Sequence, residues 1–146
     1  MADKKTIVIC SSGSFYKHCN EVADELRARG YKVVVPATAE KMKQSGDYDI
    51  DKVKTWHNDP KDVPIKISKM RAHFDEIAKG DAILLVNDDK PAQPKYLGPN
   101  GLMEWGLAAY LGKPVFILNA VDKSSNYWEE ALTAVVLNGD LGKIKL

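Results

Sequence analysis

The chain has 146 residues and a formal net charge of +1, from 21 lysines and arginines against 20 aspartates and glutamates. That length fits one domain, residues 1–146, and the interspersed charges exclude a polyelectrolyte partner such as nucleic acid. Cys10 and Cys19 have neither metal-ligand nor disulfide spacing, and no signal peptide or membrane span is evident, so we expect a cytoplasmic protein with reduced thiols.

The first half of the chain begins with a strand–helix–strand pattern. The apolar run at residues 6–10 predicts a buried strand, and the amphipathic segment 16–29 predicts a helix. Residues 31–35 predict a second strand, which a helical crossover would place parallel to the first. Residues 37–63 are the least regular part, with a short helix expected at 40–44. An excursion of that length inside a small domain favours a segment that covers substrate or contacts another subunit.

The second half continues the alternation of helices and strands. Its expected elements are a helix at 64–79, a strand at 82–86, a helix after Asn100, a strand at 115–118, a helix at 126–134 and an edge strand or turn at 139–144. Ile67 and Ile77 should lie on one buried face of the first of these helices, and Asn100 is the expected N-cap of the second. The whole pattern predicts an α/β fold, a doubly wound three-layer sandwich of the flavodoxin or Rossmann type. Its sheet should be mainly parallel, with four to five strands.

Residues 81–109 are the most informative stretch, because a buried strand leads through a polar loop into a helix that carries Glu104. In open α/β sheets, ligands bind beyond the carboxyl ends of the strands, so Glu104 is a candidate catalytic residue. A carboxylate in a first helical turn is also favoured by the helix dipole, by about 0.3–1 kcal/mol, and a structural role stays open. Its apolar neighbours Leu102, Met103 and Trp105 are unusual for a surface glutamate.

The sequence SSGS follows the first strand and precedes a helix, which exposes backbone N–H groups to a phosphate or sugar oxygen. This loop is neither a dinucleotide-binding fingerprint nor a P-loop, so we expect no cofactor of those kinds. Ser12 and Ser14 are alternatively ordinary helix caps beside Gly13. Lys17, close behind them, favours a phosphorylated ligand.

Polar residues also stand at other strand and helix ends. Asp88 follows the third strand and Asn119 the fourth, where each could bind a hydroxyl or simply make a turn. His73 and Asp75 lie near the end of a helix, and at least one of them must face away from the core. The remaining histidines have no partner at metal-ligand spacing, so the sequence indicates no metal site, and no triad or nucleophile elbow indicates an acyl hydrolase.

Three segments, ICSSGSFY, HFDEIAKGDAILLVNDDK and YLGPNGLMEWGLAAYLGKPVFILN, together resemble the nucleoside 2-deoxyribosyltransferase superfamily, and most closely its uncharacterised members. The superfamily also includes deoxynucleoside 5′-monophosphate N-glycosidases, and GxxxEWGLAAxLGKP is the most specific shared element. The resemblance implies that Glu104 is a nucleophile that attacks C1′ of the sugar, giving a glycosyl-enzyme intermediate. It also implies that Gly13 and Ser14 hold the sugar or 5′-phosphate. A homodimer or larger homo-oligomer would complete each site.

This sequence departs from the family pattern at three places around the nucleophile. Cys10 stands where the characterised enzymes have a tyrosine, and His73 holds the place of the supporting aspartate. Gly98 stands where the transferases have an acid and the phosphate hydrolases a serine. The residues that could substitute are Asp88, Asp75 and Tyr96.

The sequence therefore predicts cleavage or transfer at the N-glycosidic bond of a nucleoside or nucleoside 5′-monophosphate, without a cofactor. The alternative is a nucleotide-binding or regulatory module that keeps the pocket without turnover. The candidate catalytic residues are Glu104, Asp88, Asp75 and His73, and the candidate binding residues are Ser12, Gly13, Ser14, Lys17, Tyr96, Gly98, Asn100 and Asn119.

Overall fold

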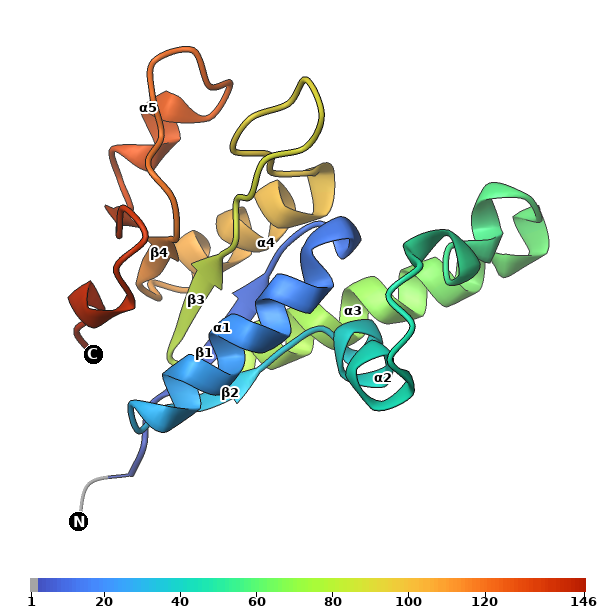
Figure 1. The fold of residues 1–146 in the computed structure, drawn as a ribbon, viewed down its shortest axis with the longest axis horizontal. Coiled ribbons are helices and arrows are strands. Elements are labelled where there is room, and N and C mark those ends of the chain that lie inside the picture. The colour runs from blue at the N-terminus through green and yellow to red at the C-terminus, as the bar shows by residue number, and fades with distance from the viewer. Residues whose placement is uncertain (1–2) are drawn as a thin grey trace.

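A single parallel sheet runs through the molecule, which a computed structural model describes over residues 3–146. Its strands are β1 (Thr6–Cys10), β2 (Lys32–Val34), β3 (Ala82–Leu85), β4 (Val115–Ile117) and β5 (Val135–Val136). They lie in the order β2-β1-β3-β4-β5, and every neighbouring pair is parallel (Figure 1). The predicted doubly wound α/β fold is confirmed, with five strands in the sheet.

The strand order places a switch point between β1 and β3. From β1 the chain steps outward to β2, returns to the other side of β1 as β3, and then continues through β4 to β5. Connections on the two sides therefore leave the sheet in opposite directions. A crevice forms where they part, at the carboxyl ends of β1 and β3, and this is the usual ligand site of such sheets.

Helices cover both faces of the sheet because strand side chains alternate between two apolar cores. Ile7 and Ile9 of β1 pack against α1 (Tyr16–Ala28), in a core that also contains the C-terminal segment. Val8 and Cys10 point the other way, into the core beneath α3 (Val63–Lys79) and α4 (Pro99–Tyr110). Every residue of β3 is buried, as expected for a strand covered on both faces.

The remaining helices are short, and they correct the predicted boundaries near the C-terminus. α2 (Ala37–Ser45) packs beside α1, whereas α5 covers only Trp128–Ala131. The helix predicted to reach residue 134 thus ends early, and the chain continues into β5, the edge strand. The tail forms a 3-10 turn at Leu141–Lys143, which is the second of the two alternatives left open by the sequence.

Two predicted details of the helices are wrong. Ile67 is 54% exposed on the outer side of α3, while Ile77 is fully buried, so the apolar stripe occupies only the later turns of that helix. The N-cap of α4 is Gly98 rather than Asn100, because the ring of Pro99 fits the first helical position. Glu104 therefore lies in the second turn, where the helix dipole favours a carboxylate less.

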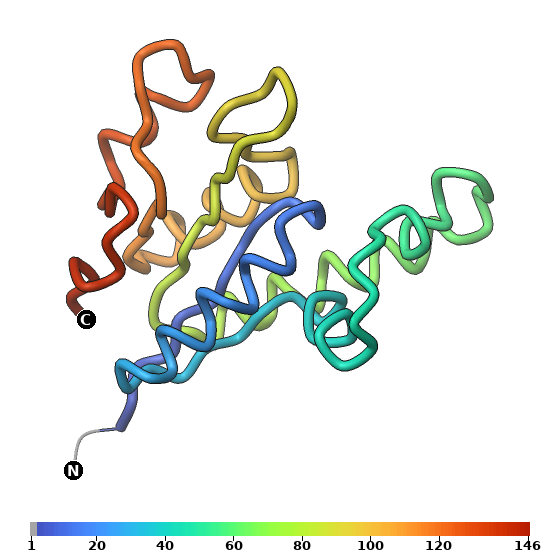
Figure 2. The backbone as a smooth tube through the Cα atoms, in the orientation of Figure 1, coloured from blue at the N-terminus to red at the C-terminus, as the bar shows by residue number. Residues whose placement is uncertain are grey.

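The segment between α2 and α3 consists of three 3-10 turns, Ile50–Lys52, Thr55–His57 and Pro60–Asp62. Figure 2 shows this segment and the first turns of α3 projecting from the body of the sheet. Ile50 packs so closely on Gly13 that a Cβ at that glycine would lie 2.5 Å from its Cδ1 atom. Within residues 3–146, no helix is long and apolar enough to cross a membrane.

Candidate active site

A cleft of about 1220 Å³ opens at the carboxyl end of β1, between the start of α1, α3, α4 and the segment that contains Ile50. Seven of the candidate residues lie along it: Ser12, Gly13, His73, Tyr96, Gly98, Asn100 and Glu104. These residues come from three separate stretches of the chain, residues 12–13, 73 and 96–104. The switch point of the sheet has therefore gathered most of the residues that the sequence singled out.

Glu104 is a buried carboxylate, and one of its two oxygens lacks a hydrogen bond. The residue is 7% exposed, held between the buried Trp105 and the core beneath α4. Its Oε2 atom is buried without a hydrogen-bond partner, although His73 Nε2 lies only 3.3 Å away. That nitrogen donates instead to the backbone carbonyl of Ile9, at 3.1 Å. Glu104 is thus close to His73 but does not form a well-aligned hydrogen bond with it.

Cys10 completes a three-residue cluster at the floor of the cleft. Its Sγ atom lies 3.6 Å from His73 Nε2, and the residue is fully buried at the end of β1. Burial raises the pKa of this thiol well above its ordinary value, and the nearby carboxylate of Glu104 raises it further. The Cys10 side chain is therefore a neutral thiol at physiological pH. Cys10, His73 and Glu104 offer ligand atoms that all lie within 4.8 Å of one another.

Tyr16, the first residue of α1, also lines the cleft and was not among the candidates. Burial, and secondarily the charge of Glu104, raises the pKa of its phenol. The side chain therefore remains an O–H donor throughout the physiological range. Its place in SSGSFY, just after the loop that begins the helix, was the available signal. Tyr16 brings a phenol to the cleft from α1, whereas the family pattern has its tyrosine near the end of the first strand.

Lys54, Lys66 and Lys90 line the cleft, and none of them forms an ion pair with an acidic side chain among residues 3–146. Burial lowers the pKa of Lys66 and of Lys90, and in both cases the charge of Lys54 lowers it further, whereas the charge of Glu104 partly offsets the shift at Lys66. The Lys90 ammonium lies 4.0 Å from the ring centroid of Tyr96, and that of Lys66 lies 5.7 Å from Trp56. Mutually repelling lysines beside aromatic rings favour a small anionic ligand with a flat group.

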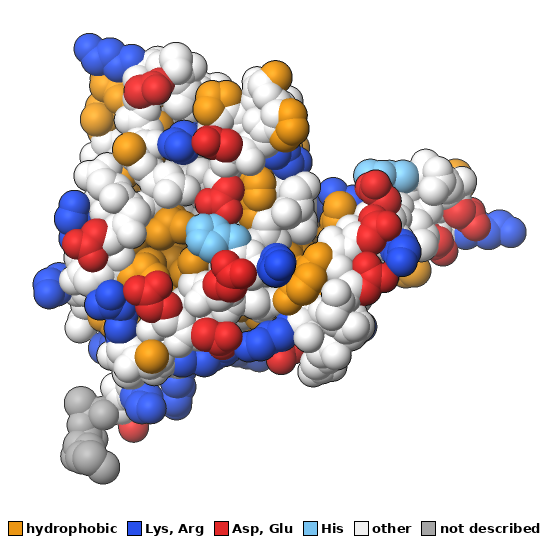
Figure 3. All heavy atoms as spheres, in the orientation of Figure 1, with side chains coloured by type: hydrophobic (Ala, Val, Ile, Leu, Met, Phe, Trp, Pro, Cys, Tyr) orange, Lys and Arg blue, Asp and Glu red, His pale blue; other side chains and the backbone are white. Residues whose placement is uncertain are grey.

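Figure 3 shows acidic and basic side chains interspersed over the face that it displays. The acidic and basic residues of the chain nearly balance, which is why the composition gave no sign of the lysines on the cleft. Spacing gave none either, because Lys54, Lys66 and Lys90 belong to three different segments of the chain.

The SSGS loop serves partly as ordinary capping. Ser12 Oγ accepts a weak hydrogen bond from the backbone N–H of Ser14, at 3.5 Å, and caps the 3-10 turn Gly13–Phe15. Ser12 and Gly13 nevertheless line the cleft as well. Ser14 and Lys17 are exposed and lie outside the described cleft lining.

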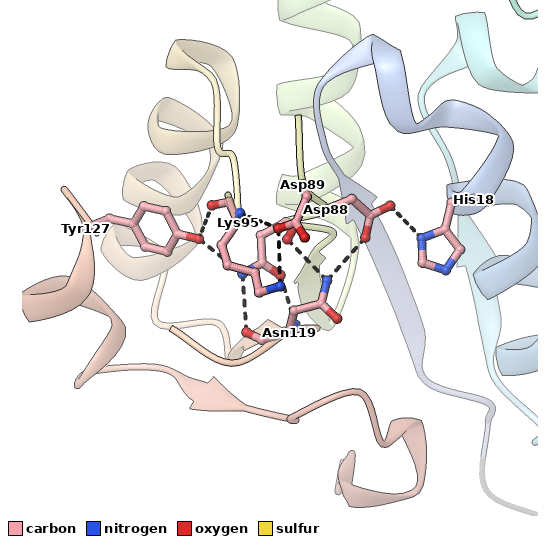
Figure 4. A network of polar contacts seen from close by, with 7 residues as sticks. His18, Asp88, Asp89, Lys95, Asn119 and Tyr127 are labelled. Carbon is pink, nitrogen blue, oxygen red and sulfur yellow. Dashed lines mark hydrogen bonds and ion pairs between the residues drawn. The ribbon is translucent and has the colours of Figure 1, made fainter. Parts of the chain in front are cut away.

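Asp88 and Asn119 belong to a separate polar network beside the cleft (Figure 4). His18 Nδ1 donates to Asp88 Oδ2 at 2.6 Å, and the Asn119 amide donates to Asp88 Oδ1 at 3.1 Å. The fully buried Asn87 accepts from the backbone N–H of Asn119 at 2.8 Å and donates to Tyr127 Oη at 3.0 Å. Both oxygens of Asp88 are thereby satisfied, and the network ties the loop after β3 to the loop after β4.

Asp75 lies on the outer side of α3, whereas His73 faces the cleft, so one of the two does face away from the core as the sequence requires. Asp75 is exposed and borders a separate hollow of about 400 Å³, together with Arg71 and Ile67. It is therefore too far round the helix to line the same cleft as Glu104 in one protomer.

A scan against models of known protein families gives no match to this chain, and a search of curated proteins gives no significant match either. The fold and the geometry of the cleft together define a doubly wound α/β protein with a buried carboxylate–histidine pair at its switch point.

Proposed function

We propose that this protein cleaves the N-glycosidic bond of a nucleoside 5′-monophosphate, by hydrolysis or by transfer of the sugar to another base. The observation that carries the proposal is Glu104 itself, a buried carboxylate on the cleft with one oxygen free of hydrogen bonds. A desolvated carboxylate oxygen without a hydrogen bond is a better nucleophile than one that is solvated.

In the proposed reaction, the carboxylate of Glu104 attacks C1′ of the sugar, and the C1′–N bond breaks. The departing base keeps the electron pair of that bond and takes a proton, which water or the neutral phenol of Tyr16 supplies. Water or a second base then attacks C1′, gives up a proton to the solvent or to the Tyr16 phenolate, and releases the carboxylate with net retention of configuration. His73, 3.3 Å from Oε2, acts as a positioning residue that holds the carboxylate toward the cleft.

The charges around the cleft favour a phosphorylated substrate over a free nucleoside. Lys54, Lys66 and Lys90 form no ion pair in the described chain, and a 5′-phosphate would relieve their mutual repulsion. Tyr96 and Trp56, beside two of these ammonium groups, offer faces on which a base could stack.

The proposal includes a cytoplasmic location and a homodimer or larger assembly whose neighbouring subunit completes the site. Both cysteines are free thiols and buried, which fits a reducing compartment.

The test is to incubate the protein with a panel of nucleosides and nucleoside 5′-monophosphates and to measure free base by chromatography. We expect base release from monophosphates with the wild type and none above background with Glu104→Gln. Glu129→Gln, an exposed glutamate on α5, is the matched control and should keep full activity. Equal release by the wild type and Glu104→Gln would exclude the proposed nucleophile.

The second candidate is a nucleotide-binding module without turnover. It is favoured by the three departures from the family pattern, at Cys10, His73 and Gly98. The panel separates the two functions, because a binder gains thermal stability from a monophosphate by mass action and returns the ligand intact.

A further inference from the structure

The geometry points to a site for a single thiophilic divalent cation, of the Zn²⁺ class, formed by Cys10, His73 and Glu104. We infer further that occupation of this site masks the carboxylate and switches the cleft off. The masking rests on the proposed function, whereas cation binding does not.

Two of the three distances between the donor atoms match those of a tetrahedral zinc site, and the third pair, sulfur and carboxylate oxygen, lies within 4.8 Å. Zinc bonds of about 2.0–2.1 Å to nitrogen, 2.0–2.2 Å to oxygen and 2.3 Å to sulfur place tetrahedral neighbours roughly 3.4 Å apart for nitrogen and oxygen, and roughly 3.6 Å for nitrogen and sulfur. His73 Nε2 lies 3.3 Å from Glu104 Oε2 and 3.6 Å from Cys10 Sγ. The three atoms come from β1, α3 and α4, so the frame of the fold holds them together.

The same geometry excludes a catalytic relay among the three residues. In a nucleophile–base–acid relay, the imidazole uses one nitrogen for the nucleophile and the other for the acid. Here the thiol and the carboxylate both approach Nε2. Three donor atoms grouped in this way, with Nε2 as one of them, can all bind one cation placed between them.

An independent observation comes from the buried oxygen of Glu104. The side chain is 9% exposed, and Oε2 has no hydrogen-bond partner although burying such an atom is costly. A cation between the three donors would satisfy it. Cation binding would release the thiol proton of Cys10 to the solvent, and His73 would ligate through Nε2 as the tautomer protonated at Nδ1, giving up its hydrogen bond to the carbonyl of Ile9.

The identity of the donors selects the class of cation. A thiolate with an imidazole favours zinc and related soft or borderline ions, whereas magnesium and calcium prefer oxygen ligands throughout. Because His73 and Glu104 line the cleft, an ion can enter from that side, and its fourth position faces the cleft. The bound ion would withdraw electron density from the carboxylate that attacks the sugar and would thereby make it a weaker nucleophile.

The test uses the whole chain and Co²⁺, a spectroscopic substitute for Zn²⁺. We expect one equivalent of Co²⁺ to give the intense visible bands of a four-coordinate ion and a thiolate-to-cobalt charge-transfer band, both of which Zn²⁺ then abolishes. Cys10→Ser should lose the thiolate band, and His73→Gln should weaken binding by at least about 10-fold.

Cys19→Ser is the matched control, since Cys19 is equally buried but lies in the core on the opposite face of the sheet. It should keep the wild-type spectrum. Circular dichroism identifies any variant that fails to fold, in which case Glu104→Gln replaces it as the test of ligand loss. A wild type without the thiolate band, or a folded Cys10→Ser variant that retains it, would overturn the site.

The activity arm separates this inference from the proposed function. If base release is observed, one equivalent of Zn²⁺ should abolish it and a chelator should restore it. A protein that shows the cobalt spectrum but releases no base would refute the glycosidase and leave the cation site standing. Active enzyme that binds Zn²⁺ at this site without inhibition would refute the masking.

Discussion

Two histidine–carboxylate pairs stand at the carboxyl edge of the same sheet, and they differ in how completely their hydrogen bonds are made. Asp88 accepts from His18 at 2.6 Å and from Asn119 at 3.1 Å, so both its oxygens have partners. Glu104 lies 3.3 Å from His73, yet its Oε2 is buried without a hydrogen bond. The satisfied pair fastens two loops together, and the unsatisfied pair lies on the cleft.

The difference identifies an unfavourable feature that the chain retains, the buried Oε2 atom of Glu104. A buried polar atom without a partner costs about 1–3 kcal/mol, so its persistence favours a role outside folding. Asp88 carries no such cost, because the imidazole of His18 and the amide of Asn119 each donate to one of its oxygens. Both carboxylates were candidates for catalysis on equal grounds of topology, and the hydrogen bonds now separate them.

The strongest test of this comparison is Glu104→Gln. Loss of the proposed nucleophile should reduce base release by about 10³-fold or more, because no other carboxylate on the cleft approaches His73 as closely among the described residues. The free energy of unfolding should stay within about 1 kcal/mol of the wild type, since the change removes a buried charge that lacks a hydrogen bond. Activity assays and urea unfolding measure the two effects; a large loss of stability would place Glu104 in the architecture instead.

The opposite outcome is expected for Asn87→Ala. Asn87 is fully buried, and its loss leaves the backbone N–H of Asn119 and the hydroxyl of Tyr127 without their partners. The free energy of unfolding should fall by about 3 kcal/mol, measured by urea denaturation. Asn126→Ala, at an exposed asparagine, should change it by less than about 0.5 kcal/mol.

A milder perturbation of the same network is Asp88→Asn. The amide replaces one acceptor oxygen, and the ion pair with His18 is lost, but His18 is 43% exposed and the pair is well screened. Stability should fall by about 1 kcal/mol, while base release stays at the wild-type rate. A fall in activity comparable to that of Glu104→Gln would return Asp88 to the catalytic machinery.

The smallest expected effects are those of Lys54→Gln. Removing this charge relieves Lys66 and Lys90, so the unliganded protein should gain up to about 0.5 kcal/mol, while monophosphate affinity falls by about 2- to 5-fold. Calorimetry measures both quantities. Lys17→Gln, at the exposed lysine that the sequence favoured for phosphate binding, should leave affinity unchanged; the reverse ranking would contradict the cationic cleft.

The same lysines set a direction for pH dependence. The pKa of Lys66 and that of Lys90 are lowered in the folded protein, so the unfolded chain binds more protons between the lowered values and the ordinary value of 10.5. The charged lysines lower the free energy of unfolding by their full amount below this pH range, and the free energy of unfolding rises as they lose their protons within it. Lys54→Gln should therefore flatten the rise, as thermal melts at alkaline pH would reveal.

The fold was predictable from the sequence because its signals are local. Buried apolar runs such as residues 82–86, separated by amphipathic segments, specify a parallel sheet without reference to distant residues. Errors fall where tertiary packing decides the outcome. Ile67 has the right spacing for the buried stripe of α3, but the early turns of that helix project beyond the sheet and leave it exposed.

The site was predictable only in part. Glu104 and the glycine-containing loop follow from the topology of strand ends, and the structure places both on the cleft. The meeting of Cys10 with His73 could not be read from spacing, since 63 positions separate them in the chain. The grouping of the lysines on the cleft could not be predicted for the same reason, because they belong to separate segments of the chain and come together only in the folded protein.

The contact between Ile50 and Gly13 affects how descendants of this chain can diverge. The 3-10 turn that contains Ile50 belongs to the connection between α2 and α3 and not to the sheet. The entropic cost of lengthening such a connection grows slowly with the number of residues added. Insertions or deletions there can remodel the entrance while the strands stay as they are. Gly13 cannot vary in the same way, because a side chain at this position would displace Ile50. New preferences for a ligand can therefore arise through the loop at little expense to the core.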